Sequence, residues 1–409
     1  MKKVIVSTLL ALAALFLLPS CNKDVIRFFD LEIALDESDF ADGVPSPDSY
    51  TVTFTNTNTG EVTEFETQTK SVSVDQLLEG VYDVVATARY SLYNYLGTAK
   101  AVVISSSDAL TSLKIKASKS SSLVFKEVFY SCSRTPSNAM YLKDNFFEVY
   151  NNGSEAVYVD GLCIATTSNY SSSSINFADE NGYMVDTEGN ATSMKADDYV
   201  VLNGIIWQIP GDGKTYLLNP GESFVIASYA TDHTAEDKNP NSIDLSSAEF
   251  ETVCDNYITN GQVDNPDSDN MILLNPAQAT ITKQYMPSVL NAGFILFAPS
   301  TPVENATLVA NYASGKVSGT YTPVLRSDVL DGINWVKNST ALGWLPEDID
   351  AGKTFVSGTY VNESIVRVKE GSSEAGDPVY KDTNNSANDF EVSTKPEIRR
   401  DTKKASWAK

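Results

Sequence analysis

The only histidine of the 409-residue chain, His233, directly follows Asp232 in an acidic stretch. An imidazole beside a carboxylate can bind a divalent metal ion or respond to pH near neutrality. A second acidic segment, Asp264–Asn270, contains Asp267 and Asp269, whose oxygen atoms suit calcium. It lacks the glycine and the distant glutamate of an EF-hand loop, so a turn capped by Asp and Asn side chains is the alternative there, and a solvated loop is the alternative at the histidine. The candidate metal ligands are Asp232, His233, Asp267 and Asp269.

Four aromatic side chains could form a ligand-binding face. Tyr93 and Tyr95 stand in a tyrosine-rich run, and Trp335 and Trp344 stand nine residues apart near the end of a long central segment. Exposed rings stack on sugars or fill pockets of a partner protein. The alternative is that these rings pack inside the core of a β-sandwich.

Motif-based enzyme classes are not indicated. The sequence contains no Gly-x-Ser-x-Gly, no phosphate-binding loop, no dinucleotide fingerprint and no Cys-x-x-Cys pair. One histidine is too few for a multi-histidine zinc or iron site. We therefore expect no catalytic residue, no cofactor and no enzymatic activity. The alternative is a hydrolase that uses two carboxylates from the segment Ser228–Val361.

The charge balance excludes one class of partner. The chain has 53 acidic residues against 30 basic ones, a formal net charge of −23. Such a chain is repelled by phosphate backbones, so we expect no nucleic-acid partner. It is also repelled by anionic lipid surfaces, unless it is anchored to them.

Residues 1–20 predict a signal peptide. Two lysines precede the apolar run Val4–Leu18, which is too short to span a membrane. The run ends just before Cys21, and this arrangement resembles the lipobox of bacterial lipoproteins. The resemblance implies that Cys21 becomes the acylated N-terminus, which anchors the chain in a membrane; an ordinary secretory signal is the alternative. At most one disulfide, or three buried thiols, is expected from the remaining cysteines, Cys132, Cys163 and Cys254.

Beyond the leader the sequence predicts an all-β protein, because short runs of Val, Ile, Thr, Tyr and Phe alternate with clusters of Asn, Asp, Gly and Ser. Residues 21–119 are expected to form a first immunoglobulin-like β-sandwich, with strands over Phe28–Leu35 and Tyr50–Thr55 and a hairpin turn at Asn56–Gly60. The pattern Leu-x-Gly-x-Tyr-x-Val at Leu78–Val84 resembles the carboxypeptidase-regulatory and prealbumin-like sandwiches of bacterial envelope proteins. That resemblance implies a structural or docking module.

Residues 120–395 are expected to form a second β-sandwich. Four pieces in order resemble the lamin-tail domain, which has an immunoglobulin-like fold. About 130 residues, from Ser228 to Val361, stand between the third piece and the fourth, and we expect them to be a large insertion. Residues 396–409 are expected to be a flexible tail, or else a basic segment that contacts an acidic partner surface. The four pieces are Phe125–Val128, Phe147–Gly153, Leu218–Glu222 and Asp382–Phe390.

The whole arrangement resembles an uncharacterised family of Gram-negative envelope lipoproteins that carries a domain-of-unknown-function label. The resemblance implies an outer-membrane, lipid-anchored location on the periplasmic or the cell-surface face, and a possible TonB-dependent β-barrel transporter as partner. We therefore expect a non-catalytic binding or accessory protein in nutrient or metal uptake. A carboxylate-dependent hydrolase and a structural or adhesive surface protein are the alternatives.

Overall fold

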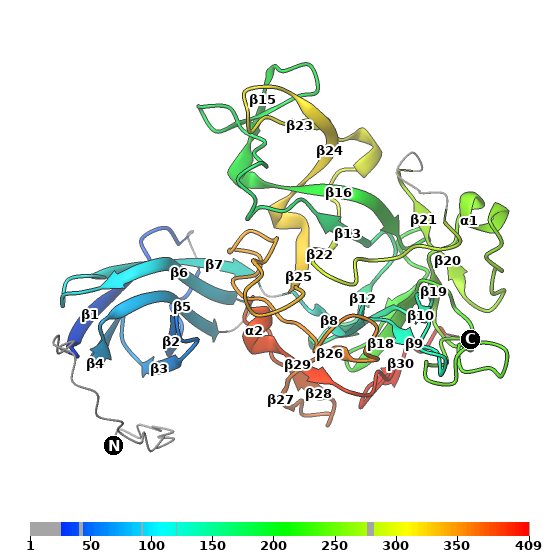
Figure 1. Ribbon diagram of the computed structural model, residues 1–409, viewed down its shortest axis with the longest axis horizontal. Helices are drawn as coiled ribbons and strands as arrows, with labels where there is room; N and C mark the ends of the chain where they lie inside the picture. The colour runs from blue at the N-terminus through cyan, green and yellow to red at the C-terminus, as the bar shows by residue number, and fades with distance from the viewer. Residues whose placement is uncertain (1–25, 41–43, 91–92, 120, 276–281, 409) are drawn as a thin grey trace.

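The computed structural model describes residues 26–40, 44–90, 93–119, 121–275 and 282–408. Strands dominate it, as the sequence predicts, and they form β-sheets in two separate regions of the chain (Figure 1). Cys21 and the predicted signal peptide lie outside the described residues. Within these residues, no helix has the length and apolar composition needed to cross a membrane.

The first region, which we call the first domain, is one seven-stranded sheet in the order β3-β2-β5-β6-β7-β1-β4, which closes around a single apolar core. Its hairpin forms as predicted, since Thr55 pairs with Val62 and Gly60 has φ +73° in the turn. Alternate residues point inward, as Val52 and Phe54 do in β2. The strands are β1 (Phe28–Asp36), β2 (Tyr50–Asn56), β3 (Val62–Thr67), β4 (Ser71–Leu78), β5 (Gly80–Tyr90), β6 (Tyr93–Ile104) and β7 (Ser112–Lys119).

The second region, which we call the second domain, begins at β8 and contains two sheets that face each other. One sheet has the order β20-β19-β18-β11-β8-β26-β29, with β30 beside β18. Its strands are β8 (Leu123–Phe129), β11 (Phe146–Asn151), β18 (Glu222–Ala227), β19 (Phe250–Glu251), β20 (Asp269–Asn270), β26 (Ser364–Arg367), β29 (Phe390–Ser393) and β30 (Lys403–Lys404).

The facing sheet has the order β23-β24-β16-β13-β22-β25, with β21 beside β16. Its strands are β13 (Cys163–Thr167), β16 (Tyr199–Gln208), β21 (Ile272–Leu273), β22 (Ala292–Phe297), β23 (Val309–Asn311), β24 (Ser318–Leu325) and β25 (Val329–Trp335).

Short pairs and turns complete this region. The pairs are β9 (Ser133–Arg134) with β10 (Met140–Tyr141), β12 (Val157–Tyr158) with β17 (Leu217–Leu218), β14 (Tyr183–Val185) with β15 (Ala191–Lys195), and β27 (Lys369–Ser372) with β28 (Pro378–Tyr380). The helical turns are α1 (Asp255–Thr259), α2 (Ser386–Asp389), η1 (Ala196–Asp198), η3 (Val303–Asn305) and η4 (Arg326–Asp328).

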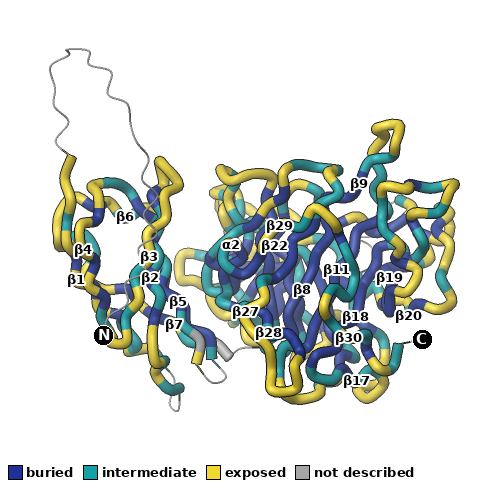
Figure 2. Tube along the Cα trace, turned by 90° about the horizontal axis from the view of Figure 1, so that it is seen from below, coloured by how far each residue is buried: buried dark blue, intermediate teal, exposed yellow. Residues whose placement is uncertain are grey.

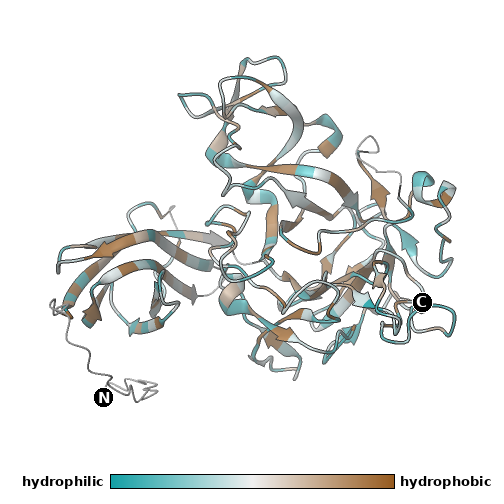
Figure 3. Cartoon of the chain, in the orientation of Figure 1, coloured by the Kyte–Doolittle hydropathy of each residue, from teal (hydrophilic) through white to brown (hydrophobic). Residues whose placement is uncertain are grey.

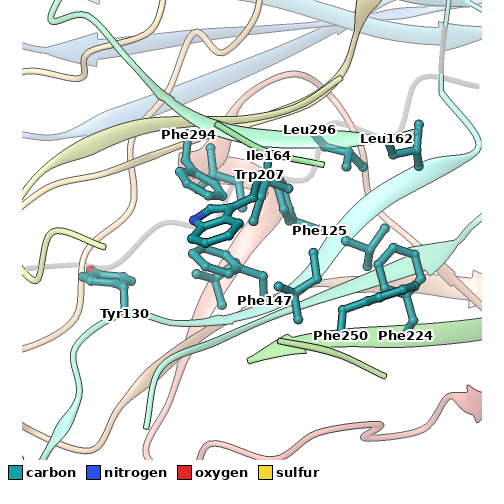
Figure 4. Close-up of a cluster of buried hydrophobic side chains, with 14 of the residues drawn as sticks. Phe125, Tyr130, Phe147, Leu162, Ile164, Trp207, Phe224, Phe250, Phe294 and Leu296 are labelled. Atoms are coloured by element: carbon teal, nitrogen blue, oxygen red, sulfur yellow. The ribbon is translucent and has the colours of Figure 1, made fainter. Parts of the chain in front are cut away.

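Aromatic rings from both sheets fill the space between them (Figure 4). The ring of Phe147 on β11 stacks on that of Phe294 on β22, with centroids 4.5 Å apart. Phe125 on β8 approaches the same Phe294 ring at 5.8 Å. Rings at these separations add specific attraction to the burial of their large apolar surfaces, so the two sheets form one sandwich core.

The segment 228–361 is built into this sandwich. It supplies β22 and β25, and β22 pairs with β13 on one side and β25 on the other. It also supplies β24, which pairs with β16. The segment expected to be an insertion therefore completes the second sheet rather than standing apart from it.

The C-terminal segment is packed, so the expectation of a flexible tail is wrong for its described residues. Strand β30 runs parallel to β18, with Lys403 opposite Glu222. The Trp407 ring contacts Tyr216 and Phe250, at centroid distances of 4.8 and 5.5 Å. A frayed end has neither a strand partner nor aromatic contacts, and this segment has both.

Candidate functional site

His233 is a buried structural residue and not a metal ligand. Its side chain is fully buried, Nδ1 lies 2.8 Å from the hydroxyl of Tyr141, and Nε2 lies 2.9 Å from the carbonyl oxygen of Tyr229. Burial lowers the pKa of His233 to about 4, so the ring is neutral at neutral pH. Both nitrogens are occupied by the protein, and the adjacent Asp232 accepts hydrogen bonds from Thr234 instead.

The second acidic segment, Asp264–Asn270, does not form a metal site with His233. The Asp269 carboxylate accepts a 2.8 Å hydrogen bond from the hydroxyl of Tyr216, and Asp267 is exposed. In the described part of the chain, no group of three or more His, Cys, Asp or Glu side chains is arranged to hold a metal ion. The four predicted metal ligands do not form such a group, and hydrogen bonds within the protein occupy the side chains of Asp232, His233 and Asp269.

Two of the four predicted ligand-binding rings lie in the cores. Tyr95 is buried in the first core, and its hydroxyl donates to the carbonyl of Pro45 at 2.6 Å. Trp335 is buried in the second core, where it stacks on Tyr130 with centroids 5.0 Å apart. For Tyr95 and Trp335, the alternative prediction of core packing is confirmed.

The other two rings are half-buried and lie in different regions. Tyr93 packs at the edge of the first core. The backbone N–H of Trp344 donates to the side-chain oxygen of Asn334 at 2.7 Å, which fixes its loop. The structure thus does not bring the predicted aromatic residues together into one face.

The three cysteines outside the leader are free thiols, as the alternative to a disulfide predicts. Cys132 and Cys163 are buried, and Cys254 is half-buried. Burial raises the pKa of the Cys163 thiol to about 12 and that of Cys132 well above its usual range. A thiol held protonated in this way is a poor nucleophile and a poor metal ligand.

A buried cluster of charged side chains surrounds Arg367. The sequence patterns do not predict this cluster. The Arg367 guanidinium lies 2.5 Å from Asp331, 3.3 Å from Asp382 and 3.7 Å from Asp389. It also donates to the backbone carbonyl oxygen of Phe125 at 2.8 Å. The cluster therefore joins β26, β25, β8 and the segment that begins at Asp382.

The cluster also reaches the first domain. The side-chain amide of Asn94, at the start of β6, donates to Asp382 at 3.2 Å. Burial raises the pKa of Asp331 to about 7 and that of Asp389 to about 6, while the positive charge of Arg367 acts in the opposite direction. Because the side chains lie at the junction of strands and not in an open cleft, their role is to hold segments together.

A second buried charge cluster lies on the outer face of β8 and β11. Glu148 accepts from Lys126 at 3.2 Å and from the backbone N–H of Arg399 at 2.9 Å. Arg399 in turn pairs with Glu249 at 2.5 Å. The C-terminal segment thus contacts an acidic surface as its charge suggests, but this surface belongs to the same chain.

A signal for the second cluster was present in the sequence. Lys126 and Glu127 stand between large apolar residues in the run that forms β8, and Glu148 stands likewise in β11. Charged residues are almost never fully buried unless they are paired. A charged residue inside an apolar strand therefore indicates a buried partner, although its identity cannot be taken from the strand itself.

Two surface hollows lie on the first domain. One of about 690 Å³ is wide open and mostly polar, with Asp36, Glu37 and Lys70 in its lining. The other is about 180 Å³ and lies between the two edge strands, β3 and β4. Phe28, Phe65 and Leu78 give the smaller hollow apolar walls.

In comparisons with known proteins, part of the chain matches a family that has no assigned activity. Residues 219–397 match the model of a family described as "Protein of unknown function (DUF4876)". The crystal structure of a DUF4876 family protein from Bacteroides thetaiotaomicron is similar, with 26% identity and a TM-score of 0.60. The alignment covers 93% of this chain and 99% of that chain. These matches support the expected resemblance to a domain-of-unknown-function family, while the lamin-tail and lipoprotein details stay predictions.

A more distant solved structure is that of a "putative adhesin" from Bacteroides ovatus, at 10% identity and a TM-score of 0.20, covering 84% of this chain and 99% of that chain. A TM-score this low does not indicate a shared fold. No curated protein matches the chain.

Proposed function

We propose that this protein is a non-catalytic binding or accessory protein, held at the outer membrane by an acylated Cys21, with the first domain as a spacer and the second domain presented to a partner. The partner that the sequence favours is a β-barrel transporter of the TonB-dependent class. The proposal places the chain on the periplasmic or the cell-surface face of that membrane.

One observation carries this proposal: the chain enters the first domain at the end that faces away from the second domain (Figure 1). Phe28 begins β1 beside the end of β4, whereas Asn94 and Thr98, which contact the second domain, lie in the first half of β6. Strand β6 has 12 residues and spans roughly 40 Å. A tether before β1 would therefore hold the second domain at a distance from the membrane.

The buried carboxylates of the segment 228–361 support a non-catalytic role. Asp350, whose pKa burial raises to about 7, accepts from the backbone N–H groups of Asn334 and Ser386 at 2.7 Å each. Asp331 accepts from the backbone of Phe125 at 2.6 Å. Perturbed carboxylates are candidates for catalysis when they line a cleft, and these two instead fasten chain segments.

The test is a crosslinked pull-down of the acylated protein from its own outer membrane, with the partners identified by mass spectrometry. We expect a stoichiometric β-barrel protein, and we expect it to be lost in the Cys21→Ser chain, which has no acyl anchor. Turnover of glycans or peptides by the purified protein, abolished by D331N or D350N in variants that keep the β-sheet circular dichroism, would contradict the proposal and favour a hydrolase.

A further inference from the structure

Large apolar side chains gather at one end of the first domain. Among its described residues, five of the six exposed large apolar side chains lie where the chain enters, and Tyr90 lies at the other end. The register of the strands places them together, since Phe28 pairs with Leu78 and Val103 pairs with Val81 beside Gly80. We call these five the entry rim: Ile26 (72% exposed), Phe28 (51%), Val62 (54%), Leu78 (37%) and Val103 (61%).

Two residues of the entry rim line the hollow between β3 and β4. Phe28 and Leu78 line this hollow together with Phe65, Leu77 and Tyr82. Figure 3 shows apolar colour reaching the ends of β1 and β4 on this side of the domain. Contiguous exposed apolar surface on a soluble domain marks a contact with protein or membrane, whereas scattered single residues do not.

The position of the anchor decides between these contacts. Only five peptide steps separate Cys21 from Ile26, and a fully extended chain of that length spans at most about 18 Å. Resting on the proposed acylation of Cys21, we infer that the entry rim lies on the lipid surface and seats the first domain upright on the membrane.

The charges around the rim specify the kind of lipid. Glu61, Asp75 and Glu79 are exposed beside it, against the exposed bases Arg27 and Lys100, and Lys100 is already paired with Asp83 and Glu347. Acidic side chains are repelled by anionic headgroups, so the rim fits a zwitterionic surface such as phosphatidylethanolamine with phosphatidylcholine. Apolar side chains of this kind insert to the depth of the headgroup and acyl boundary.

The opposite end of the domain is unsuited to the same contact. Asn94, at that end of β6, is buried against Asp382. In the middle of β6, Thr98 donates to Glu347 at 2.6 Å, and Lys100 lies 3.7 Å from the same carboxylate. These groups contact the second domain, so the entry rim is the end of the first domain that can face lipid.

The experiment places a tryptophan at each end of the first domain in the acylated full-length protein. Val62→Trp reports on the entry rim, and Tyr90→Trp is the matched control, since both replace exposed side chains. The four native tryptophans, Trp207, Trp335, Trp344 and Trp407, all lie in the second domain and give a constant background. Each variant is reconstituted in phosphatidylethanolamine and phosphatidylcholine vesicles with lipids brominated near the headgroup.

We expect bromine to quench the fluorescence that Val62→Trp adds by about twofold, because the rim lies within the interfacial layer, and to leave that of Tyr90→Trp unchanged. A second rim variant, Val103→Trp, should behave like Val62→Trp. If protein that floats with the vesicles shows no quenching at positions 62 and 103, the lipid contact is wrong although the anchor is present.

Two other outcomes also overturn the inference, and each has a distinct cause. If the full-length chain is not acylated and does not float with vesicles, the proposed function itself fails. If a photocrosslinker at position 62 captures a protein in the native outer membrane while the vesicles give no quenching, the rim binds a partner chain and not lipid.

Discussion

Strand β2 of the first domain and strand β8 of the second show two ways to build a sandwich. In β2, Tyr50, Val52 and Phe54 are buried, and the threonines between them are only half-buried. In β8 all seven residues are buried, including Lys126 and Glu127 (Figure 2). A strand covered on both faces normally reads as continuously apolar, so the charges in β8 require partners that arrive from elsewhere.

The difference has a structural cause. The outer face of β8 and β11 is covered by the C-terminal segment, which supplies Arg399, Arg400 and the backbone N–H groups that the buried glutamates accept from. Each described ion pair within the first domain, such as Lys114 with Asp39, has at least an exposed lysine. The stability of the second domain should therefore depend on buried charge pairs, and that of the first domain should not.

The largest expected effect is the loss of the charge at Arg367. R367M leaves three carboxylates without their guanidinium and should lower the free energy of unfolding by about 3–5 kcal/mol, the usual cost of breaking a buried pair. Urea unfolding followed by tryptophan fluorescence reports on the second domain alone. R326M, at the partly exposed pair with Asp348, is the control and should cost about 1 kcal/mol or less. A small effect of R367M would remove the contrast between the domains.

Removal of the C-terminal segment should come next. A chain ending at Pro396 loses the Trp407 contacts and the partners of Glu148 and Glu249, and we expect a loss of about 2–4 kcal/mol in the second domain. Limited proteolysis should cut the shortened chain faster within 121–275. K395A, at a pair that is 80% exposed on the lysine side, should leave both measurements unchanged. Equal stability of the shortened and full chains would mean that the segment is not needed as a cover.

The two domains should also respond to pH in opposite directions. Burial raises the pKa of Glu251 to about 7, so the folded second domain holds a proton that the unfolded chain releases above about pH 4.5. Its contribution to stability is full below that pH and is lost as pH rises through about 7; Asp350 acts in the same sense. His233, with a pKa of about 4, acts in the opposite sense between about pH 4 and 6.5.

In the first domain, burial acts to raise the pKa of Glu37, but Lys70, Ser46 and Tyr50 together hold it below its usual value. Its contribution is present above about pH 4.5 and is lost only in acid. We therefore expect the free energy of unfolding measured from tryptophan fluorescence in urea to be higher near pH 5 than near pH 7.5, by on the order of 2 kcal/mol, with a higher urea midpoint at pH 5. E251Q should reduce this difference. A midpoint that rises over the same interval would contradict the assignment.

The smallest expected effect concerns an exposed ion pair of the first domain. Lys114 and Asp39 of the first domain form a 2.6 Å ion pair, and both side chains are more than half exposed. K114A should change the free energy of unfolding by about 0.5 kcal/mol or less, because water and salt screen such pairs. The measurement is urea unfolding of the full chain followed by far-ultraviolet circular dichroism, from which the second-domain transition seen by tryptophan fluorescence is subtracted. A loss above about 2 kcal/mol would show that this domain also depends on its charges.

The local features of the fold follow from the sequence alone. Alternating runs predict β2 and its neighbours, and the Asn56–Gly60 turn follows from residues that adopt a left-handed backbone. Such features depend on side chains within a few positions of each other. The resemblance to a domain-of-unknown-function family follows from the arrangement of the whole chain, and residues 219–397 match the model of such a family.

Which side chains are buried, and what they contact, depends on the tertiary structure. Asp331 binds the backbone of Phe125 across 206 positions of sequence, and Arg399 binds Glu249 across 150. Trp335 is in the core and Trp344 is half-buried, although both stand in similar sequence surroundings. His233 looks like a metal ligand among acids until Tyr141 and Tyr229 occupy its ring nitrogens. Burial and partner identity are properties of distant strands brought together, and no local pattern contains them.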